Sequence, residues 1–323
     1  MRTAPRCFGA AVAALLLTAC TSHAEPRPNV VLIIADDLNV RDIPLAMPRV
    51  EKLAEQAARF DATFTPLPLC GPSRISLLTG KLPRTHGFRS NDPTGFDGSD
   101  TVATRLHAAG YSTTILGKLL NKHHRATNLE AGWDTYLPFE RHDDYGTAQS
   151  DILAKQTLEK MRDSRAPFFV YVGAAAPHGP LGGPERCLSR PIPDRPPTVR
   201  EARWTQRMTA LCGLDDLVAS LVEARGPDTY VLFTADNGWM YGENMRTGKS
   251  ELVIDAAQIP LIVWGPDVVP AHRREIVSLV DVTATVLSVA QASREGVEGR
   301  SVLPLLRDQD AERWTGTLVV EGQ

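Results

Sequence analysis

The sequence predicts an α/β fold with layers of helices around a mostly parallel sheet. Two observations support this prediction: apolar runs of strand length recur along the chain, and segments with helical apolar spacing lie between them. The chain has 323 residues, of which 43% are hydrophobic and 23% are charged. This composition is typical of soluble globular proteins, and the length is enough for one large domain or two smaller ones.

Five apolar runs are predicted to form strands. The first, NVVLIIADD at residues 29–37, is apolar without interruption until its two aspartates, which suits a strand buried on both faces of a parallel sheet. The other four runs lie at residues 111–117, 167–175, 229–237 and 259–265.

Helices and loops are predicted between these strands. A helix is expected over residues 47–60, where Val50, Leu53, Ala57 and Phe60 keep a helical spacing. The clearest other helical patterns cover residues 199–224 and 281–291. Proline and glycine are frequent in residues 176–198, and Gly, Asn, Asp and Pro in residues 87–99, so both segments are expected to be surface loops.

The N-terminus resembles a bacterial export signal. Two arginines precede an apolar run from Phe8 to Leu17, which is too short to span a bilayer. The following LTAC resembles a lipobox, which implies a signal peptide at residues 1–19, a lipidated linker at residues 20–28 beginning with Cys20, and a catalytic domain at residues 29–323. The alternative is ordinary cleavage after Ala24. We expect an exported protein that is anchored to a bacterial membrane only through lipid, or is otherwise periplasmic or secreted.

Charge and cysteine content narrow the function further. The formal net charge of −3 and the lack of a basic stripe argue against a nucleic-acid partner. Of five cysteines, Cys7 would leave with the signal peptide and Cys20 would carry the lipid. The other three cysteines would lie in an oxidising compartment, where cysteines usually form disulfides, so their odd number leaves one without a partner. Cys187 and Cys212 could pair, which would leave Cys70 alone, although spacing cannot establish the pairing.

Carboxylate and amide side chains follow two of the predicted strands. Asp36 and Asp37 end the first strand, and Asp236 and Asn237 end the strand at residues 229–237. Asp36 and Asp37 alone would fit a solvated turn or a helix cap. Functional groups in open α/β sheets gather at the carboxyl ends of the strands, and oxygen ligands of this kind suit Ca²⁺ or Mg²⁺. We therefore expect a divalent cation at this edge of the sheet.

Cys70 is predicted to lie at the N-terminus of a helix. Pro72 suits the first turn, and the segment continues to a glycine stop at Gly80. The N–H groups and dipole of a helix N-terminus favour anions, and Arg74 lies one turn further on. A cation, a helix N-terminus and an arginine together suit a negatively charged tetrahedral group.

These segments resemble the sulfatase family in sequence and in order. CGPSR at residues 70–74 matches the C-x-P-S-R core of that family, and ISLLTGKLPRTHG continues the match. The opening strand of the family resembles PNVVLIIADD, its catalytic-lysine segment resembles GKLLN, and its catalytic-histidine segment resembles APHGP. Its second metal segment resembles FTADNG, and its second-lysine segment resembles GKSELVIDAAQIPLIVWGP. Together the matched segments span residues 28 to about 306.

The resemblance implies a fold, an activity and a set of site residues. The fold would be an alkaline-phosphatase-like three-layer sandwich, with a short or absent C-terminal antiparallel subdomain. The activity would be hydrolysis of a sulfate ester, on a sulfated small molecule or glycan, by a sulfuric ester hydrolase. Cys70 would be oxidised to formylglycine by a formylglycine-generating enzyme. The calcium ligands would be Asp36, Asp37, Asp236, Asn237 and modified Cys70. Arg74 and Lys118 would hold the formylglycine and the sulfate, Lys249 would bind sulfate, and His178 would contact the leaving oxygen.

The implied chemistry suits these residue types. Calcium would lower the pKa of the hydrated aldehyde, one hydroxyl of which would attack sulfur while His178 protonates the departing alcohol. Arg74, Lys118 and Lys249 would oppose the charge on the sulfuryl oxygens. Lys118 and Lys249 could instead be ordinary solvated lysines, and His178 an ordinary loop residue. Only the ordered occurrence of the matched motifs favours the catalytic interpretation of these three. His86, His123, His124 and His142 have no comparable support.

The chain departs from the family pattern at one position, and other hypotheses stay open. Many sulfatases have a histidine two residues after the position of Lys118, where this chain has Leu120. GKLLN and DNG resemble the branch that contains N-acetylglucosamine-6-sulfatases and related glycosaminoglycan sulfatases. One competing hypothesis is a phosphodiesterase or phosphonate monoester hydrolase of the same superfamily. Another is a lipoprotein that binds sulfated glycans without turning them over.

Overall fold

The computed structural model describes residues 27–139, 146–165, 167–179, 182–242, 245–309, 314 and 318–322. The predicted signal peptide, Cys20, Ala24 and His142 lie outside the described residues. Among the described helices, none combines the length and apolar character that a membrane crossing requires.

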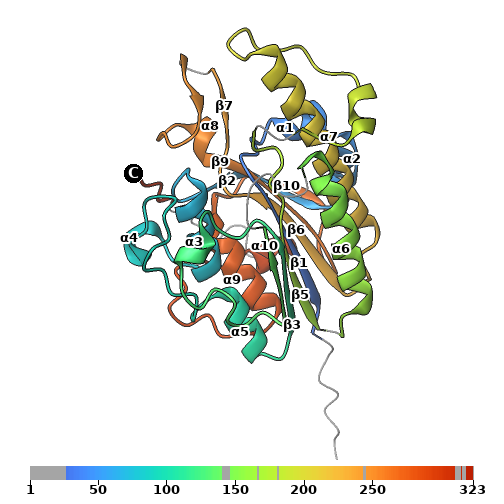
Figure 1. Cartoon of the computed structure of the whole chain (residues 1–323). Coiled ribbons are helices and arrows are strands. Elements are labelled where there is room, and N and C mark those ends of the chain that lie inside the picture. The colour runs from blue at the N-terminus through green and yellow to red at the C-terminus, as the bar shows by residue number, and fades with distance from the viewer. Residues whose placement is uncertain are drawn as a thin grey trace, which may run out of the picture.

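Nine strands of the described chain form one twisted sheet at the centre of the molecule (Figure 1). Their order is β10-β2-β9-β6-β1-β5-β3-β4, and the short β11 also pairs with β2. All neighbours are parallel except β9, which is antiparallel to β2 and β6. The bounds are β1 Asn29–Ala35, β2 Ala58–Phe64, β3 Ser112–Gly117, β4 Thr135–Pro138, β5 Phe168–Gly173, β6 Thr229–Ala235, β9 Gln258–Trp264, β10 Ala271–Arg273 and β11 Val277–Ser278.

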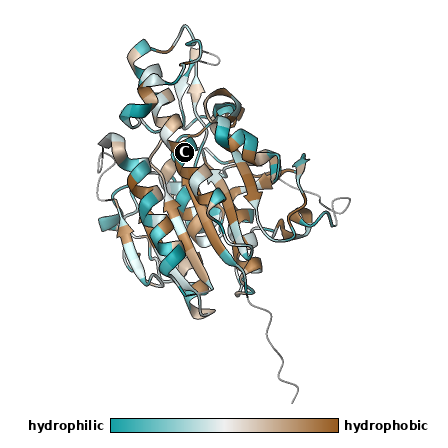
Figure 2. Cartoon of the chain, turned by 90° about the vertical axis from the view of Figure 1, so that its right-hand side faces the viewer, coloured by the Kyte–Doolittle hydropathy of each residue, from teal (hydrophilic) through white to brown (hydrophobic). Residues whose placement is uncertain are grey.

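Helices cover both faces of this sheet and complete a three-layer sandwich (Figure 1). One layer contains α1 (Asp42–Ala46), α2 (Pro48–Ala54), α6 (Gln149–Asp163) and α7 (Glu201–Glu223). The other contains α3 (Cys70–Thr79), α4 (Pro83–His86), α5 (Val102–Ala108), α9 (Leu279–Val289) and α10 (Leu303–Leu306). The hairpin of β7 (Met240–Tyr241) and β8 (Thr247–Gly248) and the short α8 (Ile254–Ala257) project beyond one end of the sheet. In Figure 2 the strands are largely hydrophobic behind helices with hydrophilic outer sides, as expected for a sheet buried on both faces.

The predicted α/β class and all five predicted strands are confirmed, whereas the helix expected at residues 47–60 is wrong in its second half. Helix α2 ends at Ala54, and residues 58–64 form β2. Phe60 is 1% exposed and lies in a strand between β9 and β10. Pairing on both sides of β2 outweighs the local helical spacing, because each backbone group gains a partner within the sheet. The described part of the chain also contains three 3₁₀ turns, η1 (His123–Arg125), η2 (Gly146–Ala148) and η3 (Glu185–Ser189).

The register between the two central strands places the acidic segments side by side. Strands β1 and β6 are parallel, and Ala35 pairs with Ala235 at their last position. Asp36 and Asp236 are the next residues in each chain segment. Because parallel strands leave the sheet at the same edge, the residues that follow them are brought together at that edge.

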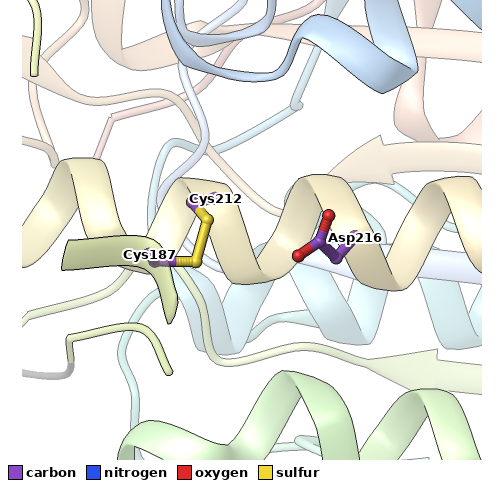
Figure 3. A group of neighbouring side chains, drawn as sticks. All are labelled: Cys187, Cys212 and Asp216. Atoms are coloured by element: carbon purple, nitrogen blue, oxygen red, sulfur yellow. A yellow bond between two sulfur atoms is a disulfide. The ribbon is translucent and has the colours of Figure 1, made fainter. Parts of the chain in front are cut away.

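A disulfide fastens the loop after β5 to helix α7. Cys187 and Cys212 are bonded, with their Cα atoms 5.9 Å apart (Figure 3), so the pairing considered from the sequence is present. Asp216 lies nearby, one turn further along α7 than Cys212. It forms ion pairs with Arg49, Arg186 and Arg190. Since disulfide sulfurs offer no thiolate, this group is a structural link and not a metal site. Cys70 is the free cysteine of the described chain.

Candidate active site

Four buried side chains form a compact cluster at the carboxyl edge of the sheet. Asp36, Asp37, Cys70 and Asp236 each offer a ligand atom, and these atoms lie within 4.8 Å of one another. All three carboxylates are fully buried. Asn237 joins them by donating a 2.7 Å hydrogen bond from Nδ2 to Asp37 Oδ1. The structure therefore brings together the five residues that the sequence analysis assigned to a metal.

Two lysines from distant parts of the chain enter this cluster. Lys118 directly follows β3 and forms an ion pair with Asp36. Lys249 directly follows β8, forms an ion pair with Asp37 and donates a 2.7 Å hydrogen bond to Cys70 Sγ. Lys118 is 4% exposed, so neither it nor the carboxylates are solvated as isolated charges. Buried charges of opposite sign must compensate each other, which explains this arrangement.

The carboxylates respond differently to this field. Burial opposes the ionisation of Asp36, but the positive charges of Lys118, His178, Lys249 and Arg74 outweigh burial and hold its pKa well below the usual range. Burial raises the pKa of Asp236, and the neighbouring Asp36 carboxylate adds to that rise. Two carboxylates this close repel each other, and this repulsion favours a cation between them.

Helix α3 presents Cys70 to the cluster from its first position. The Cys70 thiol donates a 3.2 Å hydrogen bond to Asp36 Oδ1. The next backbone N–H, from Gly71, is held by Asn91 Oδ1 at 2.7 Å, and the Ser73 hydroxyl donates to the Asp236 carbonyl. Burial and the nearby carboxylates raise the pKa of the Cys70 thiol, so an unmodified Cys70 stays protonated.

Arg74 lies behind the cluster and not at its open side. Its side chain is fully buried, and Nε donates a 2.7 Å hydrogen bond to Asp236 Oδ2. Nη1 donates to the Lys118 carbonyl at 2.7 Å and to the Tyr171 hydroxyl at 3.2 Å. Arg74 therefore holds Asp236 and the backbone of Lys118. The resemblance implies that Arg74 holds the formylglycine and the sulfate oxygens, and these two roles stay predictions.

His178 lies at the open side of the cluster. Its side chain is 27% exposed, and Nε2 is 3.8 Å from Asp37 Oδ2. With Asp37 it lines a cavity of about 240 Å³. Leu120, which stands where many sulfatases have a histidine, is buried and belongs to the hydrophobic core. His178 is thus the imidazole of the described chain that borders the cavity.

The acidic cluster meets the requirements of a hard cation. Asp37 Oδ2 and Asn237 Oδ1 are buried acceptors to which no described group donates a hydrogen bond. Buried acceptors without a donor are rare in proteins because they lose their contact with water, and a bound cation would satisfy both. Three carboxylates and an amide oxygen are the ligands that Ca²⁺ prefers. The residues present therefore fit the cation that the sequence predicted.

Several residues that support the site were not predicted. Arg207 on α7 donates to the Asp37 carbonyl at 2.7 Å and to Asp42 Oδ2 at 2.6 Å. Tyr241 contacts both Arg207 and Asp42. An arginine on the otherwise apolar face of a predicted helix is a signal that could have drawn attention to Arg207. Tyr171 carries no such signal, since a tyrosine within an apolar strand is ordinary.

Comparison with known proteins shows which family the chain belongs to. A family model described as Sulfatase matches residues 28–292. The chain belongs to the sulfatase family. It is 27% identical to N-acetylglucosamine-6-sulfatase of Homo sapiens, over 92% of this chain and 67% of the human protein. It is 26% identical to the protein of the same name from Capra hircus, over 92% of this chain and 66% of the goat protein. The chain thus spans about two thirds of the length of these relatives.

Solved structures show the same fold for this sulfatase-family chain. One, described as a complex with its substrate D-glucosamine-2-N,6-O-disulfate, has a TM-score of 0.77 at 18% identity and covers 88% of this chain and 81% of that chain. The phosphonate monoester hydrolase of Agrobacterium radiobacter has a TM-score of 0.73 at 19% identity and covers 90% of this chain and 79% of that chain. The predicted alkaline-phosphatase-like sandwich is confirmed.

Proposed function

We propose that the protein hydrolyses a sulfate ester on a carbohydrate, with Cys70 converted to formylglycine and a calcium ion held by the acidic cluster. One observation carries this proposal: the free Cys70 lies between Asp36 and Lys249, inside a cluster of carboxylates and lysines. A structural cysteine has no need for buried charges of both signs around its sulfur. An oxygen nucleophile at this position, facing an anionic substrate, requires both.

The ligands of the cation would be Asp36, Asp37, Asp236, Asn237 and modified Cys70, whose sulfur here stands in for a formylglycine oxygen. When bound, calcium would favour the ionised nucleophile and polarise the sulfate group. Magnesium would need stricter octahedral geometry, so calcium is the better match to a crowded carboxylate cluster.

The remaining residues have separate tasks in this proposal. Lys118 and Lys249 would hold the sulfuryl oxygens, since both ammonium groups lie at the cluster. With Cys70 modified and cation bound, the carboxylates would have a second positive partner, which frees the lysines for substrate. Arg74 would keep Asp236 in place. His178 would donate a proton to the departing alcohol, because its imidazole borders the cavity.

A sulfated amino sugar is the substrate class that the comparisons favour. The two mammalian relatives, at 26% and 27% identity, are N-acetylglucosamine-6-sulfatases. The phosphonate monoester hydrolase shares the fold alone at 19% identity. Turnover of aryl phosphate diesters faster than aryl sulfates would favour that competing activity.

Maturation and location belong to the same proposal. Cys70 would require a formylglycine-generating enzyme of the host, because no group in the described chain could oxidise it. The disulfide between Cys187 and Cys212 is typical of an oxidising compartment, which supports export. The lipid anchor at Cys20 would be tested by labelling the native protein with a fatty acid.

The first experiment is mass spectrometry of the Cys70 peptide from protein produced in its native host. Conversion of the thiol to an aldehyde lowers the peptide mass by about 18 Da, and we expect that change. A Cys70→Ala variant should lose turnover of sulfate esters while its circular dichroism stays native, because the sheet does not depend on this side chain. Retained turnover in that variant would contradict the formylglycine mechanism. An unmodified thiol with glycan binding but no turnover would support the binding-protein hypothesis.

A further inference from the structure

A cavity extends from the acidic cluster toward helix α7. Its volume is about 240 Å³, and Asp37 and His178 form one side of it. This is smaller than the roughly 300–1,000 Å³ of pockets for drug-sized ligands, so it suits a single sugar ring more than a chain of sugars. Other residues that line it include Arg203, Gln206, Arg207 and Trp239.

Arg203 is an unpaired cation at this cavity. It is exposed, and no residue that the structure describes forms an ion pair or a side-chain hydrogen bond with it. Many other described arginines are paired, including Arg207 one turn further along α7. Gln206 likewise has no side-chain partner within the described chain. Two solvent-exposed donors without a protein partner therefore line, from one side of a helix, the cavity that His178 also lines.

Trp239 gives the cavity a flat apolar surface that is held in place. It lies two residues after Asn237, separated from it by Gly238. The guanidinium carbon of Arg207 lies 5.7 Å from the centre of its ring, a cation–π distance. Arg207 itself is fixed by Asp42 and by the Asp37 carbonyl. The C–H face of a pyranose ring can pack on such a surface while its polar substituents reach the donors around it.

We propose that this cavity binds the sugar unit that carries the reacting sulfate, and that Arg203 binds a second anionic substituent of the same unit, a sulfate or a carboxylate. The inference rests on the proposed sulfatase function and adds a specificity-determining residue to it. Among the residues that line the cavity, Asp37 is the acidic one. It pairs with Lys249 in this structure, and the proposed cation would neutralise it in the active enzyme. A second anion near Arg203 would therefore meet a cation with no competing acidic partner.

The test compares the same enzyme on sugars with and without a second anion. The substrates are N-acetylglucosamine-6-sulfate, glucosamine-2-N,6-O-disulfate and N-oxalyl-glucosamine-6-sulfate, which carries a carboxylate on the same nitrogen and keeps the reacting sulfate at O6. We expect the wild-type enzyme to prefer one of the doubly charged sugars by at least about tenfold in kcat/KM, the ratio that one charged hydrogen bond supports. The preferred sugar identifies the second group as sulfate or carboxylate. In Arg203→Ala this preference should fall to near unity, mainly through KM.

Arg200→Ala is the matched control. Arg200 is an exposed arginine at the cap of the same helix, and it does not line the cavity. Arg200→Ala changes the net charge by the same amount as Arg203→Ala. It should leave the preference for the doubly charged sugar as in the wild type. A preference that survives in Arg203→Ala, or that falls equally in both variants, would overturn the assignment.

A binding measurement separates this inference from the proposed function. Calorimetry with the Cys70→Ala variant measures affinity for the three sugars without turnover. Tighter binding of a doubly charged sugar that disappears when Arg203→Ala is added supports the subsite, even if modified enzyme turns over no sulfate ester. Equal affinity for all three sugars refutes the subsite and leaves the sulfatase function intact.

Discussion

At the residue scale, Asp37 has the most demanding conformation of the proposed cation ligands. Its φ of 66° lies in the left-handed region, which residues other than glycine rarely adopt. Arg207 donates to its carbonyl at 2.7 Å, Asp236 Oδ1 accepts from its backbone N–H at 3.2 Å, and Lys249 pairs with its carboxylate. Surrounding contacts must maintain such a conformation, and here they orient a carboxylate toward the cluster.

Replacement of Arg207 by methionine should therefore affect both stability and cation binding. Asp42 would remain buried without its ion-pair partner, which costs about 3–5 kcal/mol of unfolding free energy. The Asp37 carbonyl would lose its donor as well, so affinity for Ca²⁺ should fall. Denaturant unfolding measures the first effect, and calcium titration by calorimetry measures the second.

The Arg207→Lys variant separates the two effects. It keeps the charge beside Asp42 but cannot reproduce the planar set of donors that reaches Asp42, Tyr241 and the Asp37 carbonyl together. We expect it to recover part of the stability and little of the calcium affinity. Wild-type calcium affinity in a folded Arg207→Met protein would show that Arg207 has no positioning role.

At the element scale, His86 joins α4 to α3, the helix that begins with the proposed nucleophile Cys70. It ends α4, and its Nε2 lies 2.9 Å from the Ser76 hydroxyl on α3. Its Nδ1 accepts a 3.1 Å hydrogen bond from the Phe88 backbone N–H. The Phe88 bond needs an unprotonated Nδ1, which places the proton of the neutral ring on Nε2 as a donor to the Ser76 hydroxyl. Protonation of Nδ1 breaks the Phe88 bond.

This contact predicts a loss of stability in mild acid. Burial lowers the pKa of His86 from its ordinary 6.5 to about 4. Between these values the unfolded chain binds a proton and the folded chain does not. Stability from His86 is therefore complete above pH 6.5 and is lost as the pH falls toward 4. Melting temperatures measured across this range should show the decrease.

His86→Asn is the matching variant for that measurement. The asparagine side-chain oxygen can replace Nδ1 as acceptor and does not titrate in this range. The melting temperature of the variant should depend less on pH between 6.5 and 4 than that of the wild type. An identical pH dependence in the two proteins would contradict the assignment to His86.

At the scale of the whole molecule, a bound cation would couple the site to global stability. The proposed ligands come from the ends of β1 and β6 and from the start of α3, so binding links the central sheet to one helix layer. A ligand at 100 times its Kd stabilises the folded state by about 2.7 kcal/mol. Removal of Ca²⁺ with a chelator should lower the melting temperature and abolish turnover of sulfate esters.

Restoring calcium distinguishes a specific site from general effects of the chelator. Added Ca²⁺ should restore both quantities in the wild type. An Asp236→Asn variant should show a much smaller calcium response, because it loses one carboxylate charge from the cluster. Indifference of the wild-type melting temperature and activity to a strong chelator would contradict the carboxylate site.

The sequence alone determined the α/β class, the five core strands and the candidate site residues. Strand identity follows from continuous apolar runs, and Asp36 and Asp236 follow two such runs. Parallel strands end at a common edge, so their convergence was predictable before any contact was known. The order of the matched motifs added Lys118, His178 and Lys249, which the structure also places at or beside the cluster.

Tertiary structure alone decided how these residues are held. The antiparallel β9, the strand β2 in place of half a predicted helix, the position of Arg74 behind Asp236 and the support of Asp37 by Arg207 all depend on contacts between distant segments. Local spacing does not encode such contacts, because the sequence pattern around an arginine on a helix face is the same whether its side chain contacts water or a buried carboxylate. Packing of the layers decides between these environments, and with them the shape of the cavity beside His178.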